Sequence, residues 1–233
     1  MTPSQRATVS VVIPVHNEAP YLPGAVARLF EQIAHVDADV SVLIAENGST
    51  DGSADVVRRL AVDRPALSLL ELPQADYGAA MRAGFLAGDG DWLVNFDIDY
   101  FSGDFLTKAI GHDDADIVLA SKRAPGSDDR RSPFRRLATW GFNLLLRSLF
   151  RSKVSDTHGM KAIRRHVVAD IVPQVGATQD LFDTELVLRA ERAGYRIAEV
   201  PVVVIEERAS KSNLLKRIPR TLRGMWRVRR NMR

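Results

Sequence analysis

Two aspartates separated by one residue, Asp97 and Asp99, close an apolar run that has the composition of a buried strand. Side chains alternate between the faces of a strand, so this spacing predicts two carboxylates on one face, roughly 6–7 Å apart. Charges at that separation repel by about 2–3 kcal/mol at an effective dielectric near 20. A divalent cation would turn the repulsion into affinity, because Mg²⁺ and Mn²⁺ prefer hard oxygen ligands. The pair therefore predicts a cation site.

Polar residues follow two other apolar runs in the same way. They are His16, Asn17, Glu18, Glu46 and Asn47. Each group alone is also explained as a polar turn or a helix cap, but three groups at successive strand ends point to one shared crevice. Because Mg²⁺ is commonly held by one or two carboxylates together with phosphate oxygens, the ligand expected there is a diphosphate.

The elements that would position these side chains alternate along the chain. Strand-like runs cover residues 8–15, 40–47, 67–72, 91–99 and 115–122, and helical patterns cover 22–35, 54–62 and 77–88. This order predicts an α/β fold with a mostly parallel sheet covered by helices on both faces. In such sheets ligands bind at the carboxyl ends of the strands. No GxGxxG or GxxxxGK[ST] motif occurs, which excludes the usual dinucleotide and P-loop sites.

Composition limits the remaining classes. A chain of 233 residues with 45% hydrophobic content can bury one substantial core. Cysteine is absent, which excludes disulfides, a thiol nucleophile and cysteine-ligated metals. No apolar segment opens the chain and no apolar run approaches ~18 residues, so we expect neither a secretory signal nor a transmembrane helix. We expect a cytoplasmic protein, peripheral on the inner face of the membrane.

The membrane expectation comes from the C-terminal tail, residues 211–233, which contains no acid. Its bases are Lys211, Lys216, Arg217, Arg220, Arg223, Arg227, Arg229, Arg230 and Arg233, and its apolar residues include Leu214, Leu215, Ile218, Leu222, Met225, Trp226 and Val228. This pattern predicts an amphipathic helix suited to an anionic membrane surface. Nucleic acid is disfavoured because a binding groove needs several stacking aromatics and the tail has one tryptophan.

Five segments of the chain resemble family 2 glycosyltransferases with the GT-A fold. They are "VSVVIPVHNEAPYL", "VLIAENGSTDGS", "YGAAMRAGF", "FDID" and "FDTELVLRAERAGYRIAEVPVVV". Within that family the chain is most similar to dolichyl- or polyprenyl-phosphate hexose synthases, which use mannose or glucose. The resemblance implies a GT-A domain over residues 1–210, with a nucleotide-binding half at about 8–122 and an acceptor half at about 123–210, followed by the tail.

The resemblance also implies roles for individual residues. The metal and diphosphate ligands would be Asp97 and Asp99. The donor-binding residues would be Pro14, His16, Asn17, Glu18, Glu46, Asn47, Gly78 and Asp97. The acceptor phosphate would contact Lys122, Arg123, Arg135, Arg208 and Lys211. A helix over residues 180–194 would direct Asp180, Asp183 and Glu185 toward the crevice, with Asp183 as the catalytic residue.

Three residues depart from the family pattern. Asn47 stands where an aspartate is more common, and Tyr100 and Phe101 follow the aspartate pair where many relatives have a polar residue that helps hold the metal. Metal binding would then depend on Asp97, Asp99 and the donor phosphates. His158 is expected to be a local spacer and not a base.

The implied activity is inverting, metal-dependent transfer of a hexose from a GDP- or UDP-sugar to a polyprenyl phosphate, with Mg²⁺ or Mn²⁺ as cofactor. An ionised phosphate acceptor needs no general base, whereas a hydroxyl acceptor needs a carboxylate such as Asp183 to take its proton. Two alternatives remain open. One uses the same donor with a soluble or protein hydroxyl acceptor, and the other is a non-catalytic sugar-nucleotide-binding module.

Overall fold

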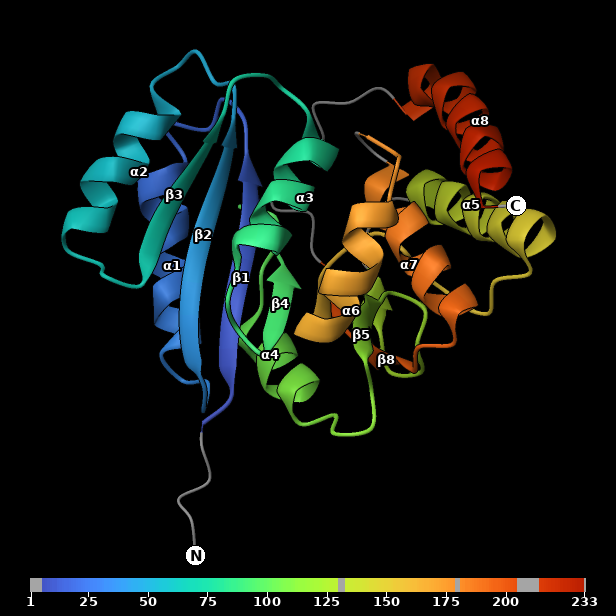
Figure 1. Ribbon diagram of the computed structural model, residues 1–233, viewed down its shortest axis with the longest axis horizontal. Coiled ribbons are helices and arrows are strands. Elements are labelled where there is room, and N and C mark those ends of the chain that lie inside the picture. Colours follow the sequence, from blue (N-terminus) through green and yellow to red (C-terminus); the bar gives the residue numbers. More distant parts are fainter. Residues whose placement is uncertain (1–5, 130–132, 179–180, 205–213, 233) are drawn as a thin grey trace, which may run out of the picture.

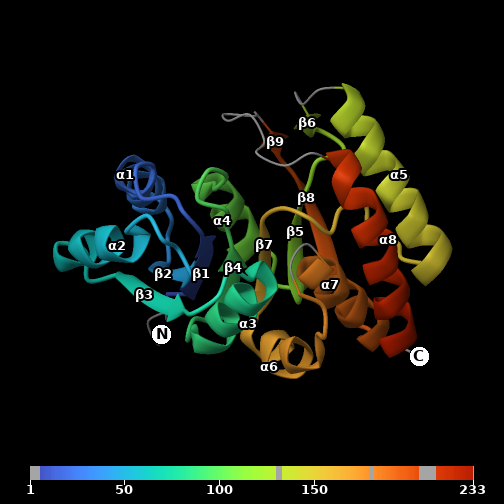
Figure 2. The ribbon, with the colours of Figure 1, turned by 90° about the horizontal axis from the view of Figure 1, so that it is seen from above.

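A seven-stranded sheet, in the order β3-β2-β1-β4-β7-β5-β8, forms the centre of the computed structural model (Figures 1 and 2). The structure describes residues 6–129, 133–178, 181–204 and 214–232. The strands of this sheet are β1 (Thr8–Val15), β2 (Asp39–Asn47), β3 (Leu67–Leu72), β4 (Trp92–Asn95), β5 (Ile117–Ser121), β7 (Lys161–Arg164) and β8 (Ile197–Pro201). A separate pair joins β6 (Asp128–Asp129) to β9 (Val203–Val204).

Helices cover both faces of the sheet, as Figure 2 shows from above. One face carries α1 (Leu22–Ile33), α2 (Ser53–Val62) and α4 (Gly103–Ile110). The other carries α3 (Tyr77–Ala87), α6 (Arg165–Ile171), a 3₁₀ turn η1 (Val172–Gln174) and α7 (Phe182–Ala193). Beyond this layer, α5 (Pro133–Phe150) and α8 (Leu214–Asn231) lie side by side. The predicted α/β fold is confirmed.

Burial on both faces explains the composition of β1. Val11 and Ile13 pack into the cluster beneath α1, and Val12 packs into the cluster beneath α3, so the strand is apolar at nearly every position. The small residues of α3 let that helix approach closely. A Cβ at Gly84 would lie 2.3 Å from Cγ1 of Val12, a distance that no side chain could accept. This close packing holds the second half of α3 against the middle of β1.

The centre of the sheet differs from the prediction in two ways. β4 ends at Asn95, because the chain turns after Phe96, whereas the predicted strand continued to Asp99. The antiparallel strand β7, which was not predicted, lies between β4 and β5 and pairs Lys161 with Asn95. A charged residue at each end and a length of only four residues make β7 a weak strand pattern.

The tail forms helix α8, but part of its apolar side faces the protein. Met225 and Val228 are buried, and Met225 packs with Leu146 of α5 and Leu188 of α7. The predicted helix is therefore present, and its contact with a membrane surface stays a prediction. No described helix combines the length and apolar character needed to cross a bilayer.

Candidate active site

The aspartate pair lies on a tight turn that follows β4. The backbone N–H of Asp97 donates to the Tyr100 carbonyl at 3.1 Å, and the N–H of Tyr100 donates back to the Asp97 carbonyl at 3.0 Å. Asp97 is half-buried and Asp99 is exposed. The predicted arrangement, two carboxylates on one face of a strand, is therefore wrong because the strand has already ended. Tyr100 closes this turn, and its ring packs with Phe101 against the core.

The environment of Asp97 favours its neutral form. Burial, and next to it the negative charge of Asp183, raises the pKa of Asp97 to about 6, and Asp99 contributes in the same direction. The ammonium groups of Lys161 and Lys122 act in the opposite direction. The turn therefore holds a carboxylate whose negative charge, when it ionises, is only partly compensated by the neighbouring lysines.

A buried ion pair lies beside Asp97. Nζ of Lys161 is 3.0 Å from Oδ1 of Asp183, and both side chains are almost completely buried. The same ammonium donates to Oδ1 of Asn95 at 2.8 Å and to the Gly159 carbonyl at 2.8 Å. The hydroxyl of Tyr77 donates to Oδ2 of Asp183 at 2.7 Å. Residues of β4, β7, α3 and α7 therefore converge at the carboxyl end of β4.

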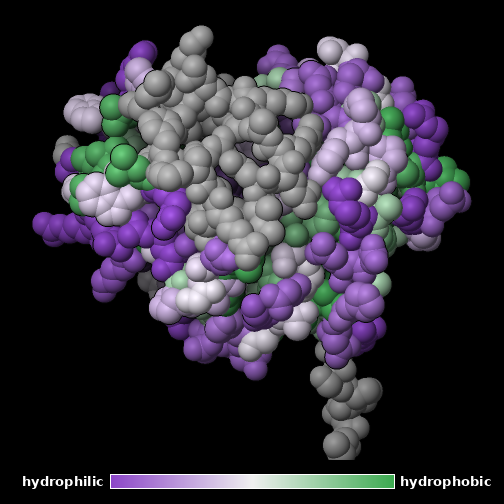
Figure 3. Space-filling model, turned by 180° about the vertical axis from the view of Figure 1, so that it is seen from behind, coloured by the Kyte–Doolittle hydropathy of each residue, from purple (hydrophilic) through white to green (hydrophobic). Residues whose placement is uncertain are grey.

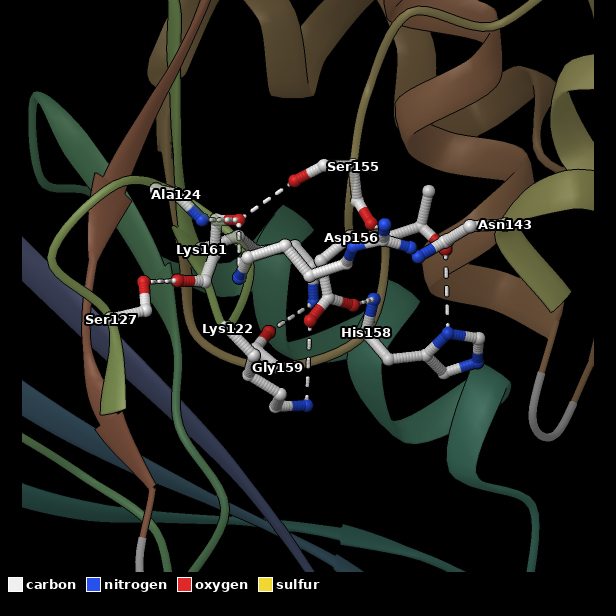
Figure 4. A network of polar contacts seen from close by, with 12 residues as sticks. Lys122, Ala124, Ser127, Asn143, Ser155, Asp156, His158, Gly159 and Lys161 are labelled. Atoms are coloured by element: carbon white, nitrogen blue, oxygen red, sulfur yellow. Dashed lines mark hydrogen bonds and ion pairs between the residues drawn. The ribbon is translucent and has the colours of Figure 1, made fainter. Parts of the chain in front are cut away.

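A second network adjoins this pair and includes the predicted phosphate ligand Lys122 (Figure 4). Nζ of Lys122 lies 3.5 Å from Oδ2 of the buried Asp156, whose Oδ1 accepts the backbone N–H of His158 at 3.0 Å. The His158 ring packs edge-on against Phe142 of α5, and burial lowers the pKa of that histidine. His158 is therefore held neutral at neutral pH between α5 and the loop that precedes β7.

Hydrogen bonds join the loops that follow β1 and β2. Nδ2 of Asn47 donates to the Val15 carbonyl at 3.0 Å, and the Asn47 carbonyl lies 2.9 Å from Nδ1 of His16. Asn17, at a φ of 54°, accepts the Thr50 backbone N–H at 2.9 Å. The two predicted donor loops therefore lie together at one edge of the sheet, as parallel strands require.

The remaining predicted donor residues lie at the same edge. Glu46 is buried, and its Oε1 accepts the backbone N–H of Ser49 at 2.6 Å, so the carboxylate turns back onto its own loop. Pro14 is half-buried in β1, and Glu18 is half-buried at the loop before α1. Gly78 is buried in the first turn of α3. Their contacts with a donor stay a prediction.

The predicted acceptor-phosphate residues are only partly described. Lys122 belongs to the network above, and Arg123 is exposed on the loop that follows β5. Arg135 lies near the start of α5. Arg208 and Lys211 lie outside the described residues.

The acidic side chains expected at the start of α7 differ in the direction they take and in their contacts. Asp183 reaches the site, whereas Oε2 of Glu185 accepts the backbone N–H groups of Gly176 and Ala177, and Oε1 pairs with Arg189 at 2.7 Å. Asp180 is outside the described residues. The direction predicted for Glu185 is wrong because the η1–α7 connection supplies donors on the other side of the helix.

Three residues of the observed site had no role in the predicted one: Tyr77, Asn95 and Lys161. Tyr77 immediately precedes the small-residue stretch of α3, Asn95 is the last residue of β4, and Lys161 is the first residue of β7. A lysine flanked by the apolar residues Met160 and Ala162 is the signal that could have identified the ion pair, because an unpaired buried charge is too costly to retain.

The carboxylates of the turn fit a hard divalent cation. The described residues include no group of three or more acidic or histidine side chains arranged as metal ligands. Asp97 nevertheless has a raised pKa, so a positive charge beside it would stabilise its ionised form. Asp97 and Asp99 supply hard oxygens, and Mg²⁺ or Mn²⁺ commonly takes one or two carboxylates and completes its coordination with phosphate oxygens and water.

Residues 10–172 match the family model described as glycosyl transferase family 2. The chain is 30% identical to glycosyltransferase AglD of Haloferax volcanii over 202 residues, which are 83% of this chain and 32% of that protein. It is also 30% identical to the polyprenol monophosphomannose synthase of Mycolicibacterium smegmatis over 228 residues, which cover 91% of this chain and 82% of the relative.

The arrangement of elements also resembles solved structures. The mannosyltransferase PcManGT from Pyrobaculum calidifontis, in complex with GDP-Man and Mn²⁺, superposes with a TM-score of 0.62 at 24% identity. The superposition covers 94% of this chain and 62% of that one. At this identity the likeness establishes the fold.

Proposed function

The chain belongs to glycosyltransferase family 2, and from this premise we propose that it transfers a hexose from a nucleoside-diphosphate sugar to the phosphate of a polyprenyl lipid. The relative from M. smegmatis is named for a polyprenol monophosphate product, which supports a lipid phosphate as acceptor. The fold neighbour was solved with GDP-Man and Mn²⁺, which makes GDP-mannose the first donor to test.

The observation that carries the choice of acceptor is the engagement of Asp183. Its Oδ1 forms an ion pair with Lys161 and its Oδ2 accepts from Tyr77, so a proton transferred to this carboxylate would leave the buried Lys161 ammonium without its paired charge. An acceptor that arrives ionised removes the need for such a base. We propose that Asp183 positions Lys161 and Tyr77, and that the acceptor is a phosphate.

The charges beside Asp97 suit the two anionic substrates. Asp97 and Asp99 would hold the cation, which when bound offsets the charge that develops on the departing diphosphate. Lys122 and Arg123, on the loop after β5, would bind the acceptor phosphate. Its oxygen attacks the anomeric carbon from the face opposite the diphosphate and forms the new C–O bond. The old C–O bond breaks, the diphosphate leaves with the electron pair, and the anomeric centre inverts.

The exposed faces of α5 and α8 would rest on the membrane, which brings the site to a lipid acceptor. Leu137, Trp140 and Leu144 are exposed on α5, and Leu222 and Trp226 are exposed on α8, at 48% and 68% respectively. In Figure 3, hydrophobic residues gather on the side where these helices lie, at the left of that view, and hydrophilic residues surround them. Exposed tryptophan and leucine among arginines suit a bilayer interface. We propose that the protein is peripheral on the cytoplasmic face.

The test is transfer of radiolabelled hexose from GDP-mannose or UDP-glucose to polyprenyl phosphate in the presence of Mn²⁺. We expect a lipid-extractable product that is lost in chelator and in Asp99→Asn. Asp63→Asn, which removes an exposed acid after α2, should retain activity. Label appearing on a hydroxyl acceptor and never in the lipid extract would favour the hydroxyl alternative. Donor binding without transfer to either would favour the non-catalytic alternative.

A further inference from the structure

A cavity lies away from the candidate active site, between the C-terminal ends of α5, α7 and α8. Its volume is about 420 Å³, and four of its lining residues are cationic: Arg151, Lys153, Arg192 and Arg229. Asp183 and Arg192 lie near opposite ends of α7, nine residues apart, which is about 13 Å of helix. The cavity is therefore a separate site.

The lining of this cavity carries more positive charge than its acidic residue can neutralise. Glu191 is the single acidic side chain of the lining, and its Oε1 accepts the backbone N–H of Lys153 at 2.7 Å. Among the described residues, no acidic side chain pairs with the charged groups of Arg151, Lys153 or Arg229. A pocket with this surplus attracts an anion.

Helix dipoles explain part of this cluster. Cations are favoured at helix C-termini, and Arg192 donates to the Met232 carbonyl at the end of α8. Three helix ends carry roughly half a negative charge each, which offsets only about half of the surplus of three positive charges. The remaining positive charge is available to a ligand.

The cavity also adjoins the exposed apolar surface. On α5, Leu137, Trp140 and Leu144 lie along one face, and Arg151 directly follows the last residue of that helix. On α8, Leu222 and Trp226 are followed on the same face by Arg229. Each apolar stripe therefore leads to a cation of the cavity. The floor of the cavity is apolar, with Leu188 and Met232 among its residues.

We propose that this cavity binds the phosphate headgroup of an anionic phospholipid, separately from the acceptor of the transfer reaction. The arginines contact the phosphate, and the stripes of α5 and α8 lie against the acyl chains near the headgroup. Arginine suits this role because its planar guanidinium matches phosphate oxygens. The inference rests on the proposed function only in placing α5 and α8 at a membrane.

The first test compares two double variants of the full chain that remove the same charge. Arg151→Gln/Arg229→Gln alters the cavity, and Arg147→Gln/Arg223→Gln removes one exposed arginine from α5 and one from α8, both outside the cavity lining. Binding to vesicles of phosphatidylglycerol and phosphatidylcholine is measured by co-sedimentation. We expect the cavity variant to bind at least about tenfold more weakly than the control variant. Equal losses would show diffuse charge attraction and overturn the proposal.

The second test identifies the source of the phosphate. Dioctanoyl-phosphatidylglycerol should raise the Tm of the wild-type protein and not that of the cavity variant, and glycerol phosphate should have a much smaller effect. An equal effect of glycerol phosphate would overturn the lipid assignment in favour of a soluble phosphate ester. If neither compound raised the Tm of the wild-type protein, the proposed phosphate site would be overturned.

A third measurement separates this proposal from the proposed function. Transfer to a short-chain, water-soluble polyprenyl phosphate without vesicles should be unchanged in the cavity variant, because neither arginine contacts the candidate active site. If wild-type protein transfers to no lipid phosphate but still shows arginine-dependent headgroup binding, the proposed function falls and the cavity assignment stands.

Discussion

The Lys161 ammonium lies 3.0 Å from the Asp183 carboxylate at a place where both side chains are shielded from water, with exposed fractions of 1% and 6%. The pair joins the middle of the sheet to the first turn of α7. It also leaves Asp183 with Tyr77 as its second partner, which makes this carboxylate part of the scaffold of the site. The position of α7 relative to the turn that carries Asp97 depends on this pair.

Lys161→Met should destabilise the protein by about 3–5 kcal/mol, because it leaves the Asp183 charge buried without its partner. Urea denaturation measures the loss. Adding Asp183→Asn to Lys161→Met should recover part of it, since the second change removes the uncompensated charge. A single variant as stable as wild type would contradict the role given to the pair.

Replacing Asp97 by asparagine should stabilise the ligand-free protein more at pH 7.5 than at pH 4. The pKa of this carboxyl is raised from 3.8 to about 6 on folding. Its contribution to stability is therefore fully present below 3.8 and is lost as pH rises through 6. Thermal denaturation of wild type and Asp97→Asn across this range gives the difference. A difference in Tm that is independent of pH would contradict the raised pKa.

Donor affinity in the presence of Mn²⁺ should fall as pH drops below about 6, because Asp97 must be ionised to hold a cation. The expected loss approaches tenfold per pH unit in the acidic limit. Calorimetric titration of GDP-mannose at pH 5 to 8 measures it. The same titration without Mn²⁺ is the control, and an identical pH dependence in both would argue against a cation held by Asp97.

Gly84→Ala should cost about 1–3 kcal/mol, because the new methyl group overlaps Val12 in the central strand. Gly141→Ala is the matched control, since its Cβ would meet nothing within 4 Å on α5. The control should gain up to about 1 kcal/mol from helix propensity. Chemical denaturation of both variants decides, and equal stabilities would show that α3 and β1 are less closely packed than described.

Met225→Ala should destabilise the protein by about 2–5 kcal/mol, because the side chain is buried against α5 and α7. Trp226→Ala, one residue later and 68% exposed, should change the free energy of unfolding little and weaken binding to anionic vesicles. Thermal denaturation and vesicle co-sedimentation separate the two effects. If Trp226→Ala were the more destabilising change, the orientation of α8 would be wrong.

The order of strands and helices over the first 122 residues was predictable because their apolar periodicities are long and clear. Local patterns could not predict β7, since its pairing depends on residues 66 positions away, such as Asn95 for Lys161. The turn at Asp97 was missed because the acids looked like a continuation of the strand. The loops at His16 and Glu46 were placed correctly, since the ends of adjacent parallel strands coincide.

The position of β7 has a consequence for how the protein folds. During synthesis, β4 exposes an unpaired edge until residues 161–164 have left the ribosome, because its partner on that side is β7. A nascent chain that stops at about residue 122 presents this edge, together with β5 lacking both of its neighbours, β7 and β8. Such edges template aggregation. The donor-side loops can form early, but the site beside them is assembled only after the second half of the chain has returned to the centre of the sheet.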